Sequence, residues 1–171
     1  MTRLQELSGK IDALDVRIGV VGLGYVGLPL AVGFAKAGVQ AIGFDLDEQK
    51  VRSIQDGVSY IEDVSCEDLA AARAAGTLSA TSDFTELEQC DVINVCVPTP
   101  LTKTKDPDVS CIVSAVEDVR RNLRRGGAFA LKQAVTSLQP EAAGDGVSWA
   151  DDAVFRIANT NRHGITMHQE R

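Results

Sequence analysis

The residues of this chain best suited to bind a ligand are three glycines at a fixed spacing, in the segment Gly22-Leu23-Gly24-Tyr25-Val26-Gly27. An apolar run, Arg17–Val21, precedes this segment, and another apolar stretch, residues 28–37, follows it. Glycines so placed between a strand and a helix form a tight turn, let the backbone approach a phosphate and allow the helix to pack closely on the strand. The helix N-terminus adds a positive dipole. The spacing therefore predicts a loop that binds the pyrophosphate of a dinucleotide, in preference to a generic tight turn.

A carboxylate lies where the adenosine ribose of such a ligand is expected. The next apolar run, Gln40–Phe44, ends in Asp45, about 20 residues after the glycines. Asp45 could instead cap the following helix, but its position at the end of a strand favours a contact with the ribose hydroxyls. Its charge would repel a 2′-phosphate, and the segment Leu46-Asp47-Glu48 offers no arginine to receive one. The sequence thus predicts NAD, rather than NADP, as the cofactor.

Three further positions have alternative interpretations. Thr99, bracketed by Pro98 and Pro100, follows an apolar run, residues 92–97, at the edge of the sheet where ligands bind. Position alone leaves open whether this is a rigid turn without a ligand or a contact with the cofactor. Taken by its position alone, Lys50 is best interpreted as an ordinary solvated surface charge. Tyr25 is bulky for a glycine turn, and a packing role is its simplest interpretation.

Groups for catalysis or metal binding do not emerge from the sequence. His163 and His168 lie in a polar C-terminal segment, where solvated histidines are expected. The four cysteines show no Cys-x-x-Cys spacing and are expected to be reduced, buried thiols. We therefore predict no catalytic residue and no metal ligand. The cysteines are Cys66, Cys90, Cys96 and Cys111.

The elements that must position these residues alternate between strands and helices. Such alternation implies right-handed βαβ units and a parallel sheet. The predicted fold is α/β, a Rossmann-type doubly wound sheet. Ser65 and Asp108 are expected to cap helices. Strands are predicted at 17–21, 40–44, 78–80, 92–97 and 128–131, and helical segments at 1–14, 26–36, 47–55, 69–75, 84–89 and 109–123.

The domain organisation is expected to have three parts. Residues 1–14 form an N-terminal helical arm, residues 15–131 form the NAD-binding domain, and residues 132–171 form a divergent tail. The apolar pattern is lost after Leu131, and residues 151–158 could form only a brief helix. Low order is the expectation for such a polar terminus.

Composition limits the class of protein. The chain has 171 residues, 44% of them hydrophobic and 24% charged, as in ordinary globular proteins. Its net charge of -7 argues against nucleic acid or an anionic membrane as a partner. No apolar stretch reaches the ~20 residues of a membrane span, and the N-terminus lacks the apolar core of a signal peptide. A cytoplasmic protein is expected.

The quoted segments together resemble the nucleotide-sugar 6-dehydrogenases, the UDP-glucose and UDP-N-acetylhexosamine dehydrogenase family. The resemblance covers about two-thirds of the chain, residues 17–131. The Pro-Thr-Pro-Leu and Tyr-Ile-Glu-Asp forms look more like the UDP-N-acetylglucosamine or UDP-N-acetylmannosamine branch than the UDP-glucose branch. It is carried by Ile18-Gly19-Val20-Val21-Gly22-Leu23-Gly24-Tyr25-Val26-Gly27-Leu28-Pro29, by Gly43-Phe44-Asp45, by Ser59-Tyr60-Ile61-Glu62-Asp63-Val64 and by Cys96-Val97-Pro98-Thr99-Pro100-Leu101-Thr102-Lys103.

The resemblance implies a specific chemistry and a set of cofactor contacts. Such enzymes oxidise the sugar C6 hydroxyl to a carboxylate in two NAD-dependent steps, through a thioester on a catalytic cysteine, and they are homodimers. Lys50, five residues after Asp45, matches a basic position that contacts the cofactor, which raises it above a plain surface charge. The candidate cofactor-binding residues are Gly22, Leu23, Gly24, Tyr25, Val26, Gly27, Asp45, Lys50, Pro98 and Thr99.

The chain also departs from the family pattern. Where the family has Glu-Ser-Thr or Gln-Ser-Thr after the fifth strand, this chain has Leu131-Lys132-Gln133-Ala134-Val135-Thr136-Ser137. The central helix and the UDP-binding domain are not found in it, and no cysteine matches the catalytic motif. We therefore expect the NAD-binding part of a UDP-N-acetylhexosamine 6-dehydrogenase, cut short and inactive alone. The alternatives are a stand-alone nucleotide-binding or interaction module without turnover, or another Rossmann dehydrogenase.

Overall fold

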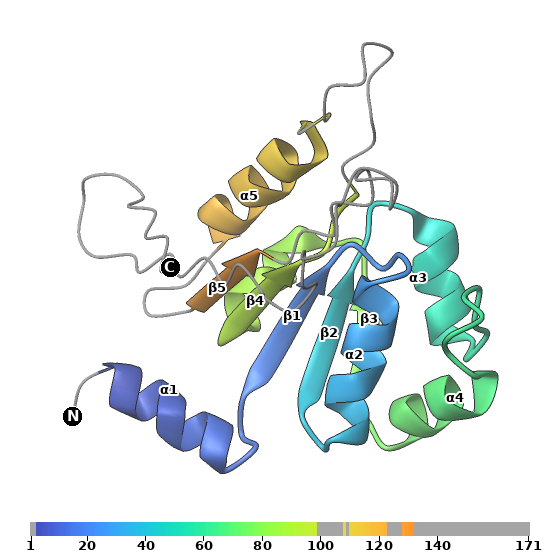
Figure 1. Ribbon diagram of the computed structural model, residues 1–171, viewed down its shortest axis with the longest axis horizontal. Helices are drawn as coiled ribbons and strands as arrows, with labels where there is room; N and C mark the ends of the chain where they lie inside the picture. Colours follow the sequence, from blue (N-terminus) through green and yellow to red (C-terminus); the bar gives the residue numbers. More distant parts are fainter. Residues whose placement is uncertain (1–2, 99–107, 109, 123–127, 132–171) are drawn as a thin grey trace, which may run out of the picture.

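The computed structural model describes residues 3–98, 108, 110–122 and 128–131 and contains one five-stranded, fully parallel sheet. The strand order is β3-β2-β1-β4-β5, so the chain starts in the centre of the sheet and builds outward in both directions (Figure 1). The α/β, Rossmann-type prediction is confirmed. The strands are β1 (Arg17–Val21), β2 (Gln40–Phe44), β3 (Leu78–Thr81), β4 (Val92–Val95) and β5 (Ala128–Leu131).

Helices cover both faces of this sheet. Helices α2, α3 and α4 pack on one face, and α5 together with the 3₁₀ helix η1 packs on the other (Figure 1). The helical segments are α1 (Arg3–Asp12), α2 (Gly27–Lys36), α3 (Glu48–Gln55), α4 (Cys66–Ala74), η1 (Phe84–Gln89) and α5 (Ser110–Asn122).

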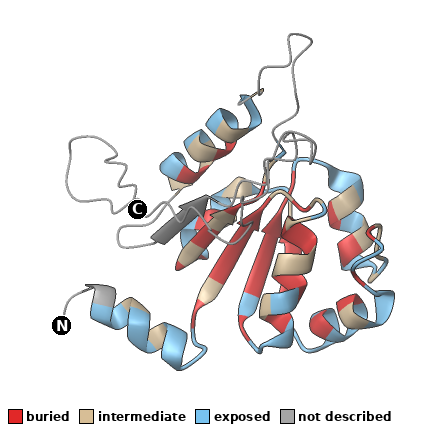
Figure 2. Cartoon of the chain, viewed as in Figure 1, coloured by how far each residue is buried: buried red, intermediate tan, exposed pale blue. Residues whose placement is uncertain are grey.

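Two apolar cores follow from this layering. Four of the five residues of β1 and four of β2 are buried, as expected for central parallel strands covered on both faces (Figure 2). One core joins these strands to α2, α3 and α4, with Leu23, Leu28 and Leu69 fully buried in it. The other core joins β2 and β4 to η1 and α5, and it is centred on Phe44 and Ile93. The sheet is therefore a rigid base for whatever lies at its edges.

Helix starts follow the capping residues that the sequence contains. Ser65 accepts a hydrogen bond from the Asp68 N–H at 3.0 Å, Asp47 accepts one from Gln49 at 2.9 Å, and Asp108 accepts one from Ser110 at 2.9 Å. Each satisfies a backbone donor that the first turn leaves without a partner. Helix α4 consequently begins at Cys66, three residues before the predicted start.

The predicted strand over 92–97 is two residues too long. The strand β4 ends at Val95, although the Cys96 N–H still bonds to the Val21 carbonyl at 2.7 Å. Beyond this bond the chain that follows β1 turns at Gly22, where an added Cβ would lie 2.8 Å from the Cys96 carbonyl oxygen. The register of β4 with β1 ends at the pair Val21–Val95, before Pro98, so the proline is not what ends this ladder.

The N-terminal helix is tied to the base of the sheet through a buried carboxylate. Asp91 is 5% exposed and accepts the Arg17 N–H at 3.0 Å and the Lys10 ammonium at 2.9 Å. Leu7 packs against the larger core, whereas Ile11 and Leu14 are about half exposed. The predicted arm is thus a helix with one anchored face.

The four cysteines divide into two buried and two exposed thiols. Cys90 and Cys96 are buried as predicted, but Cys66 and Cys111 are exposed, so the prediction is wrong for these two. The predicted tail, residues 132–171, lies outside the described residues, as does its candidate helix. None of the described helices is long and apolar enough to cross a membrane.

Candidate functional site

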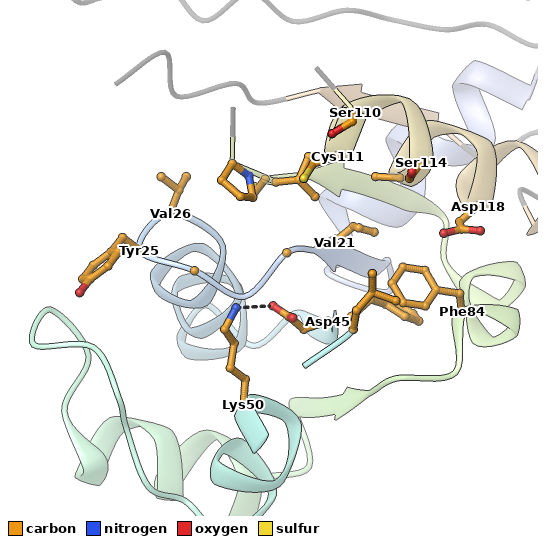
Figure 3. A pocket seen from close by; sticks show the side chains of 18 of the residues that line it. Val21, Tyr25, Val26, Asp45, Lys50, Phe84, Ser110, Cys111, Ser114 and Asp118 are labelled. Carbon is orange, nitrogen blue, oxygen red and sulfur yellow. Dashed lines mark hydrogen bonds and ion pairs between the residues drawn. The ribbon is translucent and has the colours of Figure 1, made fainter. Parts of the chain in front are cut away.

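A cleft of about 720 Å³ opens at the carboxyl ends of β1, β2 and β4 (Figure 3). It lies where the sheet order reverses, because the chain leaves β1 toward β2 on one side and β4 pairs with β1 on the other. Ligands of open α/β sheets bind at this point. Its walls come from the loop after β1, the end of β2, the segment around Tyr60, η1, the end of β4 and one face of α5.

Most of the predicted cofactor-binding residues meet in this cleft. Two of the others, Leu23 and Gly27, are buried beneath its wall and do not line it. Thr99 lies outside the described residues. The predicted residues that line the cleft are Gly22, Gly24, Tyr25, Val26, Asp45, Lys50 and Pro98.

The three positions of the motif require glycine for different physical reasons, or do not require it for the fold. Gly22 has φ +91°, in the left-handed region, and a Cβ there would lie 2.8 Å from the Cys96 carbonyl oxygen. A Cβ on Gly27 would overlap the Gly22 carbonyl. Both therefore need glycine to form the turn and to pack helix α2 against it. A Cβ on Gly24, in contrast, would meet no protein atom within 4 Å, so the fold alone does not require glycine there.

This cradle fits the pyrophosphate of NAD. The open space at Gly24 is on the cleft wall, where a phosphate could come close to the backbone. Helix α2 begins beside it, and its N-cap residue, Val26, makes no side-chain capping bond. In the first turn the Leu28 N–H donates to the Gly24 carbonyl at 3.1 Å and Pro29 has no N–H, so the helix dipole is what favours a negative ligand at this end of α2.

Asp45 connects the glycine loop to the end of β2. One carboxylate oxygen accepts the Leu23 N–H at 2.8 Å and the Lys50 ammonium at 3.0 Å, and the other accepts the Asp47 N–H at 2.9 Å. The residue is only 9% exposed, and its three hydrogen-bond donors offset the cost of burying a charged carboxylate. A carboxylate has about four accepting positions, so one is left for a ribose hydroxyl.

Lys50 is part of the site. Its ammonium pairs with Asp45, and its side chain is 34% exposed, so the interpretation as an ordinary surface charge is wrong (Figure 3). It lies in the first turn of α3, five residues after the aspartate, which places it against the end of β2. Figure 3 shows the pair on the wall of the cleft between the glycine loop and Phe84.

The two tyrosines differ sharply in their surroundings. Tyr25 is 78% exposed on the rim of the cleft, so it has no packing role, and its contact with the cofactor stays a prediction. Tyr60 is half-buried and donates its hydroxyl hydrogen to the Leu23 carbonyl at 2.8 Å. Burial raises the pKa of the Tyr60 phenol, and the nearby charges of Asp45 and Asp47 raise it further. Tyr60 therefore stays protonated, and a donor, throughout the physiological range.

One wall of the cleft, supplied by α5, is not among the residues predicted from the sequence. Its inward positions recur at helical spacing, which is the signal that could have indicated them. The sequence does not indicate that this face of α5 opens on the cleft, because α5 lies far along the chain from the glycine loop. The additional lining residues of α5 are Ser110, Cys111, Ser114, Ala115 and Asp118.

The described residues of the cleft supply groups that can bind an anion and a hydroxyl. No group of three or more His, Cys, Asp or Glu side chains within the described ranges could hold a metal ion. Both histidines lie outside those ranges. The cleft therefore offers a phosphate cradle, a carboxylate with its ammonium partner, and apolar walls.

Comparisons with known proteins agree with this geometry. Residues 16–140 match the model of the UDP-glucose/GDP-mannose dehydrogenase family, NAD binding domain. The chain is 38% identical over 112 residues to UDP-N-acetyl-D-glucosamine 6-dehydrogenase of Pseudomonas aeruginosa, covering 66% of this chain and 26% of that enzyme. It is 36% identical over 136 residues to UDP-N-acetyl-D-mannosamine dehydrogenase of Methanococcus aeolicus, covering 77% of this chain and 30% of the relative.

Solved structures show the same relationship. The UDP-D-ManNAc dehydrogenase of Pyrococcus horikoshii superimposes with a TM-score of 0.64 at 33% identity, over 68% of this chain and 28% of that one. A ternary complex of GDP-mannose dehydrogenase from Pseudomonas aeruginosa gives a TM-score of 0.64 at 32% identity, over 70% of this chain and 28% of that one. This chain thus spans less than a third of the length of these relatives. It belongs to the UDP-glucose/GDP-mannose dehydrogenase family, of which it carries the NAD-binding domain.

Proposed function

We propose that this chain holds NAD in the cleft and serves as the cofactor-binding part of a nucleotide-sugar 6-dehydrogenase that acts on a UDP-N-acetylhexosamine. The observation that carries the proposal is the position of Asp45, which reaches both the glycine loop and Lys50 at the reversal point of the sheet. The names of the relatives, a UDP-N-acetyl-D-glucosamine and a UDP-N-acetyl-D-mannosamine enzyme, support the sugar class.

The proposed contacts divide the cofactor between three parts of the cleft. Gly22, Gly24, Tyr25 and Val26 and the start of α2 receive the pyrophosphate, assisted from behind by Leu23 and Gly27. Asp45 and Lys50 receive the adenosine ribose, and Asp45 disfavours a 2′-phosphate. Pro98 and Thr99 are proposed to face the remainder of the cofactor after β4.

NAD supplies a hydride acceptor when it is bound. The role of this chain is to bind the cofactor and keep its ribose and pyrophosphate in one orientation. We propose no catalytic residue in it, because no cysteine matches the family's catalytic motif. The UDP-sugar substrate, a homodimer and a cytoplasmic location belong to the same proposal, together with the division into residues 1–14, 15–131 and 132–171.

Two measurements on the 171-residue chain test this function. Calorimetry should show binding of NAD and much weaker binding of NADP. An assay of NADH formation with UDP-N-acetylglucosamine and UDP-N-acetylmannosamine should show no turnover, because a dinucleotide site needs a covering domain to exclude water around the reacting centre. Equal affinity for NADP would contradict the assignment of Asp45, and turnover by this chain would contradict its role as a binding part only.

A further inference from the structure

Tyr60 is placed to control the glycine loop without belonging to it. It lies in the segment between α3 and α4, 37 residues from its partner, and its ring lines the cleft. Its hydroxyl donates to the carbonyl of Leu23, the residue between the first two glycines. The bond therefore joins two segments that are adjacent only in the folded chain.

Leu23 is fixed by hydrogen bonds to its N–H and to its carbonyl and by burial of its side chain. Its carbonyl accepts from Tyr60 at 2.8 Å, and its N–H donates to Asp45 at 2.8 Å. Its side chain is fully buried against Gly43, where an added Cβ would lie 2.7 Å from a Leu23 methyl group. The Leu23 carbonyl belongs to the peptide group between Leu23 and Gly24. The orientation of that group fixes the direction in which the chain enters Gly24, the glycine with open space beside it.

The segment that carries Tyr60 is itself braced. The Ser59 hydroxyl donates to the Ile61 carbonyl at 2.9 Å and accepts the Ile61 N–H at 3.2 Å. Ile61 is 5% exposed and anchors the segment in the larger core. Tyr60 thus extends from a fixed support and is not a mobile surface side chain.

We propose that Tyr60 is a positioning residue for the cofactor: by holding the Leu23 carbonyl, it keeps the glycine loop in the shape that receives the pyrophosphate. The inference rests on the proposed binding of NAD in this cleft. Because the N–H of the same residue, Leu23, bonds to Asp45, the ribose position and the pyrophosphate position are held together as one unit. Preorganisation of this kind raises affinity by removing the cost of ordering the loop when the ligand binds.

The test compares Tyr60→Phe with Thr77→Val in the full chain. Thr77 makes the same kind of bond, from its hydroxyl to the Ala72 carbonyl at 3.1 Å, but it precedes β3, at the opposite end of the sheet from the cleft. Both variants lose one partly buried hydrogen bond, so a general loss of stability affects both. Only Tyr60→Phe should alter the loop.

Calorimetric titration with NAD, well below the unfolding temperature, should show a dissociation constant about three- to tenfold higher for Tyr60→Phe and unchanged for Thr77→Val. Hydrogen exchange in the free proteins should show faster exchange of the loop amides at residues 22–25 in Tyr60→Phe alone. Equal NAD affinity of Tyr60→Phe and the unmutated chain would overturn the positioning role, and so would unchanged exchange. Failure of the unmutated chain to bind NAD would instead count against the proposed function, and the exchange experiment would still decide whether Tyr60 holds the loop.

Discussion

At the scale of single residues, Asp45 organises the cleft through one side chain. Its carboxylate bonds to the glycine loop at Leu23, to the start of α3 at Asp47 and to the ammonium of Lys50. The charge that is proposed to select the ribose is thus also part of the fold of the site. Replacing it should change both affinity and cofactor preference.

The variant Asp45→Asn should bind NAD roughly ten- to hundredfold more weakly, since bonds to a charged acceptor are stronger than bonds to a neutral one. It should also gain affinity for NADP, because Lys50 loses its counter-charge and can pair with a 2′-phosphate. Calorimetry with both cofactors measures the change. In the double variant Asp45→Asn/Lys50→Met the gain for NADP should disappear. An NADP affinity that does not respond to either substitution would contradict this account.

Gly24 and Gly27 provide a matched pair that separates binding from folding. Gly24→Ala should fold with near-normal stability, since its Cβ meets no protein atom within 4 Å, yet bind NAD at least tenfold more weakly because the methyl group occupies the space for the phosphate. Gly27→Ala should destabilise the fold by about 1–3 kcal/mol or more, because its Cβ overlaps the Gly22 carbonyl. Thermal unfolding and calorimetry distinguish the two outcomes. Normal NAD binding by Gly24→Ala would show that the pyrophosphate does not lie there.

At the scale of elements, the helices around the sheet depend on their capping residues and on a few ion pairs between elements. The start of α4 is the clearest case. Asp68 follows the Ser65 cap and accepts the Lys36 ammonium of α2 at 3.0 Å. These hydrogen bonds from Lys36 and from Ser65 hold the pKa of Asp68 below its ordinary value.

A lowered pKa in the folded chain means that the charged form of Asp68 stabilises the fold. This contribution is present above about pH 4, the unfolded value, and is lost as the pH falls through the folded value. In Asp68→Asn the unfolding midpoint should therefore be slightly lower at pH 7 and should converge with that of the unmutated chain at acidic pH, once Asp68 is protonated in the folded state. High salt should reduce the difference at pH 7, since the pair is exposed. A difference that persists at low pH would contradict the role of the charge.

At the scale of the whole molecule, the fold and the cleft depend on the same two cores. The cleft is lined by residues from the ends of three strands, from the segment around Tyr60 and from α5, so it exists only when the chain is fully folded. A ligand that binds there must stabilise the folded state.

NAD should raise the unfolding temperature of the 171-residue chain in a concentration-dependent way. At a free concentration of about 100 times its dissociation constant the stabilisation is about 2.7 kcal/mol, or roughly 5–10 °C for a domain of this size. NADP at the same concentration should give a much smaller shift. Differential scanning fluorimetry measures both. An equal shift with the two cofactors would show that Asp45 does not discriminate between them.

Much of this molecule is encoded in short stretches of sequence. The glycine spacing, the run that ends in Asp45 and the caps at Ser65 and Asp108 indicated the sheet, most helix starts and the class of ligand, because steric limits and hydrogen-bond donors act within a few residues. The family resemblance added Lys50, which its own position did not indicate.

Only the tertiary structure decided which distant residues meet. It placed Lys50 on Asp45, Tyr60 on the Leu23 carbonyl and one face of α5 on the cleft, and it left Cys111 exposed there. It also ended β4 at Val95, since the partner strand had already turned away. Tyr60 is 37 residues from Leu23, and α5 is farther still from the glycine loop, so these contacts depend on how the two apolar cores pack on the sheet. Lys50 is only five residues from Asp45, but its contact depends on where α3 lies against the end of β2.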